Sequence, residues 1–442
     1  MKCCERRAIL INMRKPLLCV PLLLASLLFG APPEKELISV VVTPDHPDWT
    51  YEVGEPVQFH VSVERDGAIV PDVPIQYEIG PEQYEPETEG RQATSAQGLT
   101  LEAQGMEQPG FLRCSVTATY QGNEYEAVGT AAFAPDEIEP ATEEPEDFWR
   151  FWRNAIAEVR EVPLEPTLEY LPELSDGKVK SYHVSFRNQP RNRIYGILCV
   201  PTAPGKYPAI LRVPGAGVRS YSGERSMAAA GAITLQIGIH GLPVRYPEET
   251  YEGLKYGALY NYYIDQIEDR DRYYYKRVFL GCIKAVDFLE TVPAWDGEHI
   301  GVTGGSQGGG LSIMTASLHE DIDAFVAFYP AMCDMLGKLD GHAAGWPRLF
   351  NRFDAQDHPD WLEVVPYYDG VNFARHLDKP GWMAFGFNDT VVPPTSMFAV
   401  YHSFERTPEL HLYRDTGHWA YPEAHEASEA WMLDQLGGPG PR

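Results

Sequence analysis

A glycine-rich segment in the second half of the chain surrounds a serine that has the setting of a catalytic nucleophile. The segment reads Gly304-Gly305-Ser306-Gln307-Gly308 and stands between an apolar run and a helix-like stretch. A strand that turns sharply into a helix leaves no room for Cβ atoms beside the central serine, which explains glycines on both sides. The serine would then lie at a helix amino end, where N–H groups favour developing negative charge. A plain glycine-rich turn or a phosphate cradle is the alternative, although the Lys-Ser/Thr ending of a nucleotide loop is absent.

Two side chains that a nucleophilic serine requires follow it along the chain. A serine hydroxyl is a weak nucleophile near neutral pH, so an imidazole must accept its proton and a carboxylate must fix the tautomer of that imidazole. Asp389 and His418 each follow an apolar run expected to form a strand, at the strand end where doubly wound sheets assemble their sites. The order Ser306, Asp389, His418 is that of the α/β-hydrolases and predicts a serine hydrolase.

Other residues compete for these two roles. Asp415 is the alternative acid, although it precedes His418 by only three residues and such a loop carboxylate is usually solvated. Three more histidines share the C-terminal region: His402 and His425 on expected helices and His411 within an expected strand. His418 is preferred because it follows a glycine on a loop.

Opening an ester also requires two N–H donors directed at the position of the tetrahedral oxyanion. The backbone N–H of Gln307 is expected to be one of them. The second normally comes from a loop after an earlier strand, and the glycine-flanked turn Val213-Pro214-Gly215-Ala216-Gly217 is suitable. We nominate Ala216 as the donor, with a plain turn after a core strand as the alternative.

Motifs for other chemistry are missing. The sequence has neither a metal-ligand set nor a dinucleotide glycine motif, so no cofactor and no metal are expected. Beyond residue 31 the cysteines have no CxxC spacing, and their apolar surroundings favour free buried thiols over disulfides: Cys114, Cys199, Cys282 and Cys333. A group of tyrosines is expected in the core and at interfaces, with a sugar-stacking wall as the alternative: Tyr256, Tyr260, Tyr262, Tyr263, Tyr273, Tyr274 and Tyr275.

The elements that would position these residues form an α/β domain over residues 148–442. Strand-like apolar runs alternate with longer amphipathic segments, which is typical of a doubly wound, mostly parallel sheet. The segment from Arg272 to Thr291 has apolar residues at three- and four-residue steps and predicts a helix with one buried face. The expected strands are 194–200, 209–213, 233–239, 300–303, 324–328, 383–387 and 410–413.

Residues 35–134 have a different pattern. Short runs alternate apolar and polar residues, as in Val57, Phe59, Val61 and Val63, and turn dipeptides separate the runs. This pattern predicts an all-β immunoglobulin-like sandwich. Residues 135–147 combine proline with acidic residues and predict an extended linker.

The composition and the first residues of the chain indicate where the protein functions and which partners it does not bind. The chain has 442 residues, with 36 Lys and Arg against 63 Asp and Glu, and its net charge of −27 argues against nucleic-acid binding. Arg14 and Lys15 precede the apolar run 16–29, a layout that predicts a signal peptide over residues 1–31, with a buried helix as the alternative. No stretch is long enough for a membrane span. We therefore expect a secreted or periplasmic protein.

Four stretches, some of which include residues already named, carry a family resemblance: 272–289, 295–310, 371–380 and 385–401. Through them the chain from about Phe148 onward resembles the acetyl xylan esterase and cephalosporin-C deacetylase family, carbohydrate esterase family seven, among the α/β-hydrolases. The resemblance implies removal of O-acetyl groups from xylan or other acetylated saccharides. It also implies that Ser306, Asp389 and His418 form the catalytic triad and that the amides of Ala216 and Gln307 bind the oxyanion.

The chain departs from the family pattern at three places. His240-Gly241-Leu242 replaces the usual Arg-Gly-Gln, Pro214-Gly215-Ala216 replaces His-Gly-Tyr, and Trp419 replaces the Glu after the histidine. We expect His240 and Trp419 to contact the substrate. The departures leave open an esterase for a bulkier acyl group or a uronic acid methyl ester, or a non-catalytic glycan-binding protein. Homo-oligomers are a further possibility, because members of the family often form them.

Overall fold

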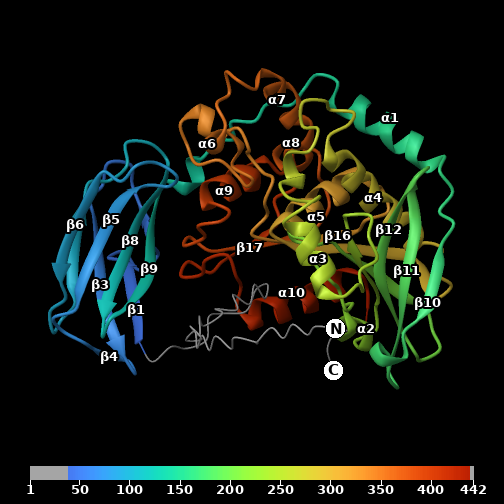
Figure 1. Cartoon of the computed structure of the whole chain (residues 1–442), viewed down its shortest axis with the longest axis horizontal. Helices are drawn as coiled ribbons and strands as arrows, with labels where there is room; N and C mark the ends of the chain where they lie inside the picture. Colours follow the sequence, from blue (N-terminus) through green and yellow to red (C-terminus); the bar gives the residue numbers. More distant parts are fainter. Residues whose placement is uncertain (1–37, 439–442) are drawn as a thin grey trace, which may run out of the picture.

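The computed structural model describes residues 38–438, in two regions joined by one connecting segment (Figure 1). The expected signal peptide lies outside these residues. No helix within them is long and apolar enough to cross a membrane.

The first region is a β-sandwich, as the alternating pattern predicts. One sheet has the order β1-β3-β4 with β7 also paired to β3, and the other has the order β2-β9-β8-β5-β6. In β3, Val57, Phe59, Val61 and Val63 are fully buried and alternate with exposed residues over most of the strand. The strands are β1 Ile38–Pro44, β2 Thr50–Tyr51, β3 Val57–Arg65, β4 Ala68–Ile69, β5 Pro74–Pro81, β6 Thr88–Ala93, β7 Leu99–Ala103, β8 Gly110–Tyr120 and β9 Asn123–Phe133.

The second region is built on one large sheet with the order β10-β11-β12-β14-β13-β15-β16-β17-β18. The pairs β10-β11, β11-β12 and β12-β14 are antiparallel, and the pairs from β14 to β18 are parallel. The sheet is therefore mostly parallel, as expected. The strands are β10 Thr167–Tyr170, β11 Val179–Gln189, β12 Asn192–Pro201, β13 Tyr207–Arg212, β14 Ile233–Gly238, β15 Trp295–Gly305, β16 Ala324–Phe328, β17 Gly381–Phe385 and β18 Glu409–Leu412.

Helices pack against this sheet and against one another. α1, α4, α5 and α8 form a packed group, while α2 and α10 contact the sheet below α4 and α5 in the view of Figure 1. The helices are α1 Phe148–Arg160, α2 Arg225–Ala229, α3 Glu248–Lys255, α4 Tyr274–Leu289, α5 Gln307–Leu318, α6 Leu349–Arg352, α7 Pro359–Val364, α8 Gly370–Ala374, α9 Pro394–Ser403 and α10 Pro422–Gln435.

The structure differs from the expected elements at one helix and two strands. The helix expected with one buried face, α4, is buried nearly all round, because α1 covers the side away from the sheet and even Lys284 is enclosed. Two strands were not expected, β10 and β11. All four residues of β10 are exposed at the sheet edge, and β11 is rich in polar residues, so neither has a clear apolar pattern.

The segment 135–147, expected to be extended, begins with a short 3-10 helix over Pro135–Glu137 and is firmly attached to the second region. The N–H of Ala141 donates to Asp334 Oδ1 at 2.8 Å, and the Thr142 hydroxyl donates to Asp369 Oδ2 at 2.9 Å. Because these partners are buried, the segment fixes the sandwich beside the large sheet instead of acting as a loose tether. The four cysteines Cys114, Cys199, Cys282 and Cys333 are free and buried.

Candidate active site

Ser306 stands at a sharp turn between β15 and α5. Its backbone angles, φ 60° and ψ −126°, lie in a region that non-glycine residues rarely adopt. A Cβ on Gly304 would come within 2.5 Å of the Gly308 carbonyl oxygen, and a Cβ on Gly308 within 2.6 Å of the Val213 oxygen. The turn therefore requires these glycines, and it holds the serine hydroxyl at the carboxyl edge of the sheet.

Ser306, His418 and Asp389 form one hydrogen-bonded chain. His418 Nε2 lies 3.0 Å from Ser306 Oγ, and His418 Nδ1 lies 2.8 Å from Asp389 Oδ2. Asp389 is fully buried, whereas the His418 side chain is 23% exposed. Because a carboxylate only accepts hydrogen bonds, Nδ1 carries the imidazole proton and Nε2 presents its lone pair to the hydroxyl.

The loop around Asp389 fixes the direction of its carboxylate. Oδ1 accepts hydrogen bonds from the N–H groups of Val391 and Val392 at 2.8 and 2.9 Å, so that Oδ2 faces the imidazole. On another side the ring of Tyr329 packs against the His418 ring with centroids 4.7 Å apart. Both contacts restrict the rotation of the groups that relay the proton.

The other acid and the other histidines considered for the relay have different partners. Asp415 is exposed and accepts a hydrogen bond from the Tyr421 hydroxyl, and it is not the partner of His418. His402 Nδ1 bonds the carbonyl of Ile138. The ring of His411 stacks on Trp382, and that of His425 packs against Phe328.

The two nominated oxyanion donors come from different elements, α5 and the loop after β13. Gln307 is the first residue of α5, so its N–H has no acceptor within the helix. Ala216 lies on the loop after β13, and among the described residues its N–H has no hydrogen-bond acceptor. Its carbonyl accepts a hydrogen bond from Arg219, which holds the loop from the carbonyl side.

The side chain of Gln307 supports this arrangement in a way that the sequence analysis missed. Its amide nitrogen donates to the Pro214 carbonyl at 3.1 Å, at the start of the oxyanion loop. Its amide oxygen accepts the hydroxyls of Tyr262 and Tyr275, both at 2.7 Å. The buried side chain of Gln307 therefore links α5 to the loop that carries Ala216.

His240 lies beneath the same loop. Its Nε2 is 3.0 Å from the Gly217 carbonyl oxygen, and its Nδ1 is 2.6 Å from the Tyr274 hydroxyl. Nε2 therefore donates while Nδ1 accepts, and burial lowers the pKa of the imidazole to about 4. With both nitrogens engaged inside the protein, His240 supports the oxyanion loop and offers no free ring nitrogen to a substrate.

The remaining aromatic candidates divide by burial. Tyr262, Tyr273, Tyr274 and Tyr275 are buried, whereas Tyr256 and Tyr260 are exposed. Buried tyrosines usually find partners for their hydroxyls, and the choice of tyrosine instead of phenylalanine was the available sequence signal for the network under the loop. Trp419 is partly exposed beside His418, and its indole packs edge-on against Tyr421 at 4.9 Å.

The neutral state of His240 predicts an acid-dependent loss of stability. Between pH about 4 and 6.5 the unfolded histidine binds a proton that the folded one excludes, so the free energy of unfolding falls as the pH is lowered through this range. His240→Gln keeps an amide donor for Gly217 but cannot titrate, and its stability should fall less steeply. Urea unfolding at a series of pH values measures how the free energy of unfolding depends on pH in both proteins. The same dependence in His240→Gln and in the unaltered protein would contradict a neutral, buried His240.

Comparisons with known proteins agree with these observations. The sequence model of the family described as Acetyl xylan esterase (AXE1) matches residues 136–435. Acetyl esterase Axe7A of Xylanibacter ruminicola is 35% identical over 404 residues, which cover 90% of each chain. An alignment of that length extends into the sandwich.

Solved structures resemble the second region. The acetyl xylan esterase from Paenibacillus sp. R4 is 27% identical, with a TM-score of 0.59, and the match covers 68% of this chain and 98% of that one. Acetyl xylan esterase 1 from Thermoanaerobacterium sp. JW/SL YS485 is 25% identical, with the same TM-score of 0.59 and coverage of 68% and 97%. These matches cover nearly all of the solved chains but only about two thirds of this one.

Proposed function

This chain belongs to the acetyl xylan esterase family of carboxylic ester hydrolases, and on that basis we propose that it removes acetyl groups from acetylated xylan through an acyl-enzyme on Ser306. The observation that carries the proposal is the continuous relay from the Ser306 hydroxyl through His418 to Asp389, with contacts of 3.0 and 2.8 Å. A relay of this geometry supplies the base that a serine lacks by itself.

The first half of the proposed reaction transfers the acetyl group to the enzyme. Ser306 Oγ attacks the acetyl carbonyl carbon while His418 Nε2 takes the hydroxyl proton. The carbonyl oxygen becomes an oxyanion that accepts hydrogen bonds from the N–H groups of Gln307 and Ala216. When the intermediate collapses, the bond from carbon to the sugar oxygen breaks, and His418 passes its proton to that oxygen.

The second half regenerates the enzyme. A water molecule gives a proton to His418 Nε2 and attacks the acetyl carbon on Ser306. Collapse of this second intermediate breaks the bond to Oγ, returns the proton to the serine and releases acetate. Throughout, Asp389 holds the imidazole in the required tautomer and stabilises its charged form.

Release of acetate from a polymer tests the proposal. Purified protein should release acetate from acetylated xylan and should hydrolyse p-nitrophenyl acetate faster than esters with bulkier acyl groups. Enzymatic determination of free acetate measures the first reaction, and absorbance of nitrophenolate the second. A uronic acid methyl ester, with methanol as the measured product, serves as the comparison substrate.

Each contrary outcome identifies another function. Methanol release without acetate release would replace acetylated xylan by an esterified uronic acid as the substrate. Preferential hydrolysis of long acyl esters would replace the acetyl group. Binding to xylan without turnover of any ester would mean that the hydrolase scaffold is non-catalytic.

We also propose that the protein is exported before it acts. Support comes from the basic flank Arg14-Lys15 before the apolar run 16–29, and from a polymeric substrate that does not enter cells. Cell fractionation and amino-terminal sequencing of the recovered protein test this, and a cytoplasmic protein that retains residues 14–31 would contradict it.

A further inference from the structure

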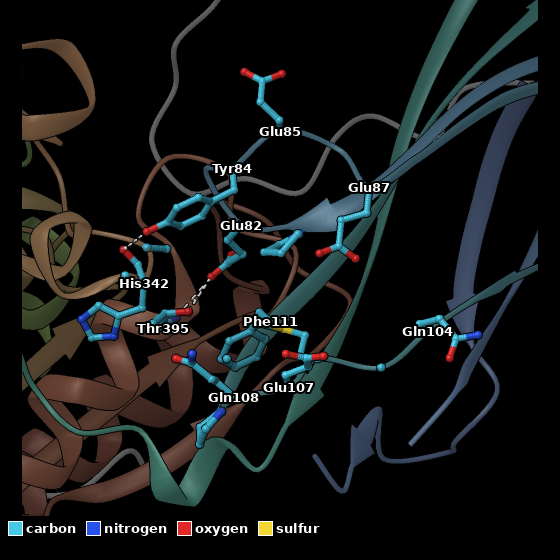
Figure 2. Close-up of a pocket in the computed structure, with 17 residues that line it drawn as sticks. Glu82, Tyr84, Glu85, Glu87, Gln104, Glu107, Gln108, Phe111, His342 and Thr395 are labelled. Atoms are coloured by element: carbon cyan, nitrogen blue, oxygen red, sulfur yellow. Dashed lines mark hydrogen bonds between the residues drawn. The ribbon is translucent and has the colours of Figure 1, made fainter. Parts of the chain in front are cut away.

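The sandwich contacts the second region at the loop that carries Asp389. A cleft of about 420 Å³ lies between the two regions, and residues from both of them line it. Figure 2 shows Glu82, from the turn after β5, reaching across to Thr395 in the first turn of α9. The loop 386–393 connects β17 to α9 and passes this contact.

Arg113 of β8 binds the loop at Asp389 itself. Its Nη2 donates a hydrogen bond to the backbone carbonyl oxygen of Asp389 at 2.9 Å, and the same nitrogen contacts Glu82 Oε1 at 2.5 Å. The Arg113 side chain is 14% exposed, and that of Glu82 is 1% exposed. The guanidinium thus connects the sandwich to the peptide unit that sets the direction of the Asp389 side chain.

Glu82 holds the first turn of α9, the helix that follows this loop. Its Oε2 accepts the Thr395 hydroxyl at 2.8 Å and faces the Thr395 N–H at 3.4 Å. A carboxylate at this position also interacts favourably with the amino end of α9, which has ten residues. The Glu82–Arg113 ion pair therefore holds both the loop at Asp389 and the start of the helix that follows it.

An aromatic contact supports the two polar ones. Phe111 precedes Arg113 by two residues on β8, so both side chains point to the same face. The Phe111 ring lies 5.2 Å from that of Phe387 at the start of the loop and 5.7 Å from that of Phe398 in α9. Apolar packing and charged hydrogen bonds from one strand thus converge on a single loop.

We propose that the sandwich is part of the catalytic unit, with Arg113 and Glu82 as positioning residues that keep the Asp389 carboxylate aligned with His418. This inference rests on the proposed serine esterase function. The Asp389 carboxylate must stay within hydrogen-bond reach of His418 Nδ1, and a misplacement of about 1 Å in such a relay can cost roughly 100-fold in rate.

Removal of the guanidinium should affect turnover more than substrate binding. For Arg113→Ala we expect kcat for p-nitrophenyl acetate to fall by about 10- to 100-fold, with little change in KM. Arg113→Lys should recover part of the loss, because an ammonium group can still donate to the Asp389 carbonyl. Burial raises the pKa of Glu82 to about 7 even though the Arg113 guanidinium lowers it. Removal of Arg113 would raise this pKa further, so the carboxyl would take up a proton instead of remaining as an unpaired buried charge.

Gln83 provides the matched control. It joins the same two regions through its side-chain amide, which bonds the Ala344 carbonyl at 2.8 Å and the Ala344 N–H at 3.1 Å, but it does not touch the Asp389 loop. Gln83→Ala weakens the contact between the regions and should leave kcat close to that of the unaltered protein. Equal losses in Arg113→Ala and Gln83→Ala would mean that docking in general matters, and would overturn the specific role of Arg113.

A spectroscopic signal reports on the relay itself. The proton between His418 Nδ1 and Asp389 should give a low-field resonance that persists in Gln83→Ala and shifts or broadens in Arg113→Ala. If Arg113→Ala does not fold, Arg113→Lys and Glu82→Gln provide the comparison, with the resonance and kcat both altered relative to Gln83→Ala. An unaltered chain without esterase activity refutes the proposed function, whereas an active chain with kcat and resonance unchanged in the folded Arg113 and Glu82 variants refutes this inference alone.

Discussion

Ser306→Ala should lower kcat for acetyl esters by roughly 10³- to 10⁶-fold while leaving the fold intact. The change removes only Oγ, the atom that lies 3.0 Å from His418 Nε2, so the nucleophile is lost and the two oxyanion N–H groups remain. Alanine keeps the Cβ that the strained turn already accommodates. Rates with p-nitrophenyl acetate and with acetylated xylan measure the loss.

Ser312→Ala is the matched control for this change. Ser312 is a buried serine on α5, the helix that follows Ser306, and its hydroxyl donates to the Gly308 carbonyl at 2.8 Å without reaching the relay. This variant should retain most of the activity. Equal rates in Ser306→Ala and in the unaltered protein would remove Ser306 from the mechanism.

Asp389→Asn should lower kcat by about 10³- to 10⁴-fold. The N–H groups of Val391 and Val392 point at one carboxylate oxygen, so an asparagine would place its own oxygen there and turn its NH₂ group toward His418. The imidazole would then have to accept at Nδ1 and carry its proton on Nε2. In that tautomer it cannot take the proton from Ser306.

Asp415→Asn separates this effect from a general change in loop charge. Asp415 is exposed and lies on the loop that leads to His418, but its carboxylate accepts a hydrogen bond from the Tyr421 hydroxyl. Its replacement should change kcat little. A near-normal rate for Asp389→Asn, combined with a large loss for Asp415→Asn, would transfer the orienting role to the second carboxylate.

The nucleophile turn and its partners were predictable because each has a local signal. Glycines on both sides of Ser306 mark positions where a Cβ would clash with neighbouring backbone, and Asp389 and His418 lie on loops that follow apolar runs. Parallel strands gather such loop residues at one edge of a sheet, so the chain order was sufficient to expect their convergence. The mostly parallel sheet and the preceding sandwich followed from hydrophobic periodicity in the same way.

The supporting contacts could not be predicted from the sequence. Gln307 was selected for its backbone N–H, but the partners of its side chain, Tyr262 and Tyr275, depend on how α4 packs against α5. His240 was expected to contact the substrate because it departs from the family pattern. Only the packing shows that both of its ring nitrogens form hydrogen bonds within the protein.

Contacts between the two regions were the least accessible to sequence reasoning. Arg113 looks like an ordinary polar position in an alternating strand, and Glu82 like one of several acids in a turn. Their meeting with Asp389 depends on how two separately patterned regions dock, and residue spacing within either region carries no signal for that geometry.

Reaction with a phosphorylating ester reagent tests the central claim most directly, because the phosphoryl group remains on the attacking atom. Diethyl p-nitrophenyl phosphate should inactivate the protein with one phosphoryl group attached per chain, and peptide mass spectrometry should place that group on Ser306. Asp389→Asn should react far more slowly, since the relay from Asp389 Oδ2 through His418 activates the hydroxyl. Full inactivation with Ser306 unmodified, or with the label on another residue, would contradict the account.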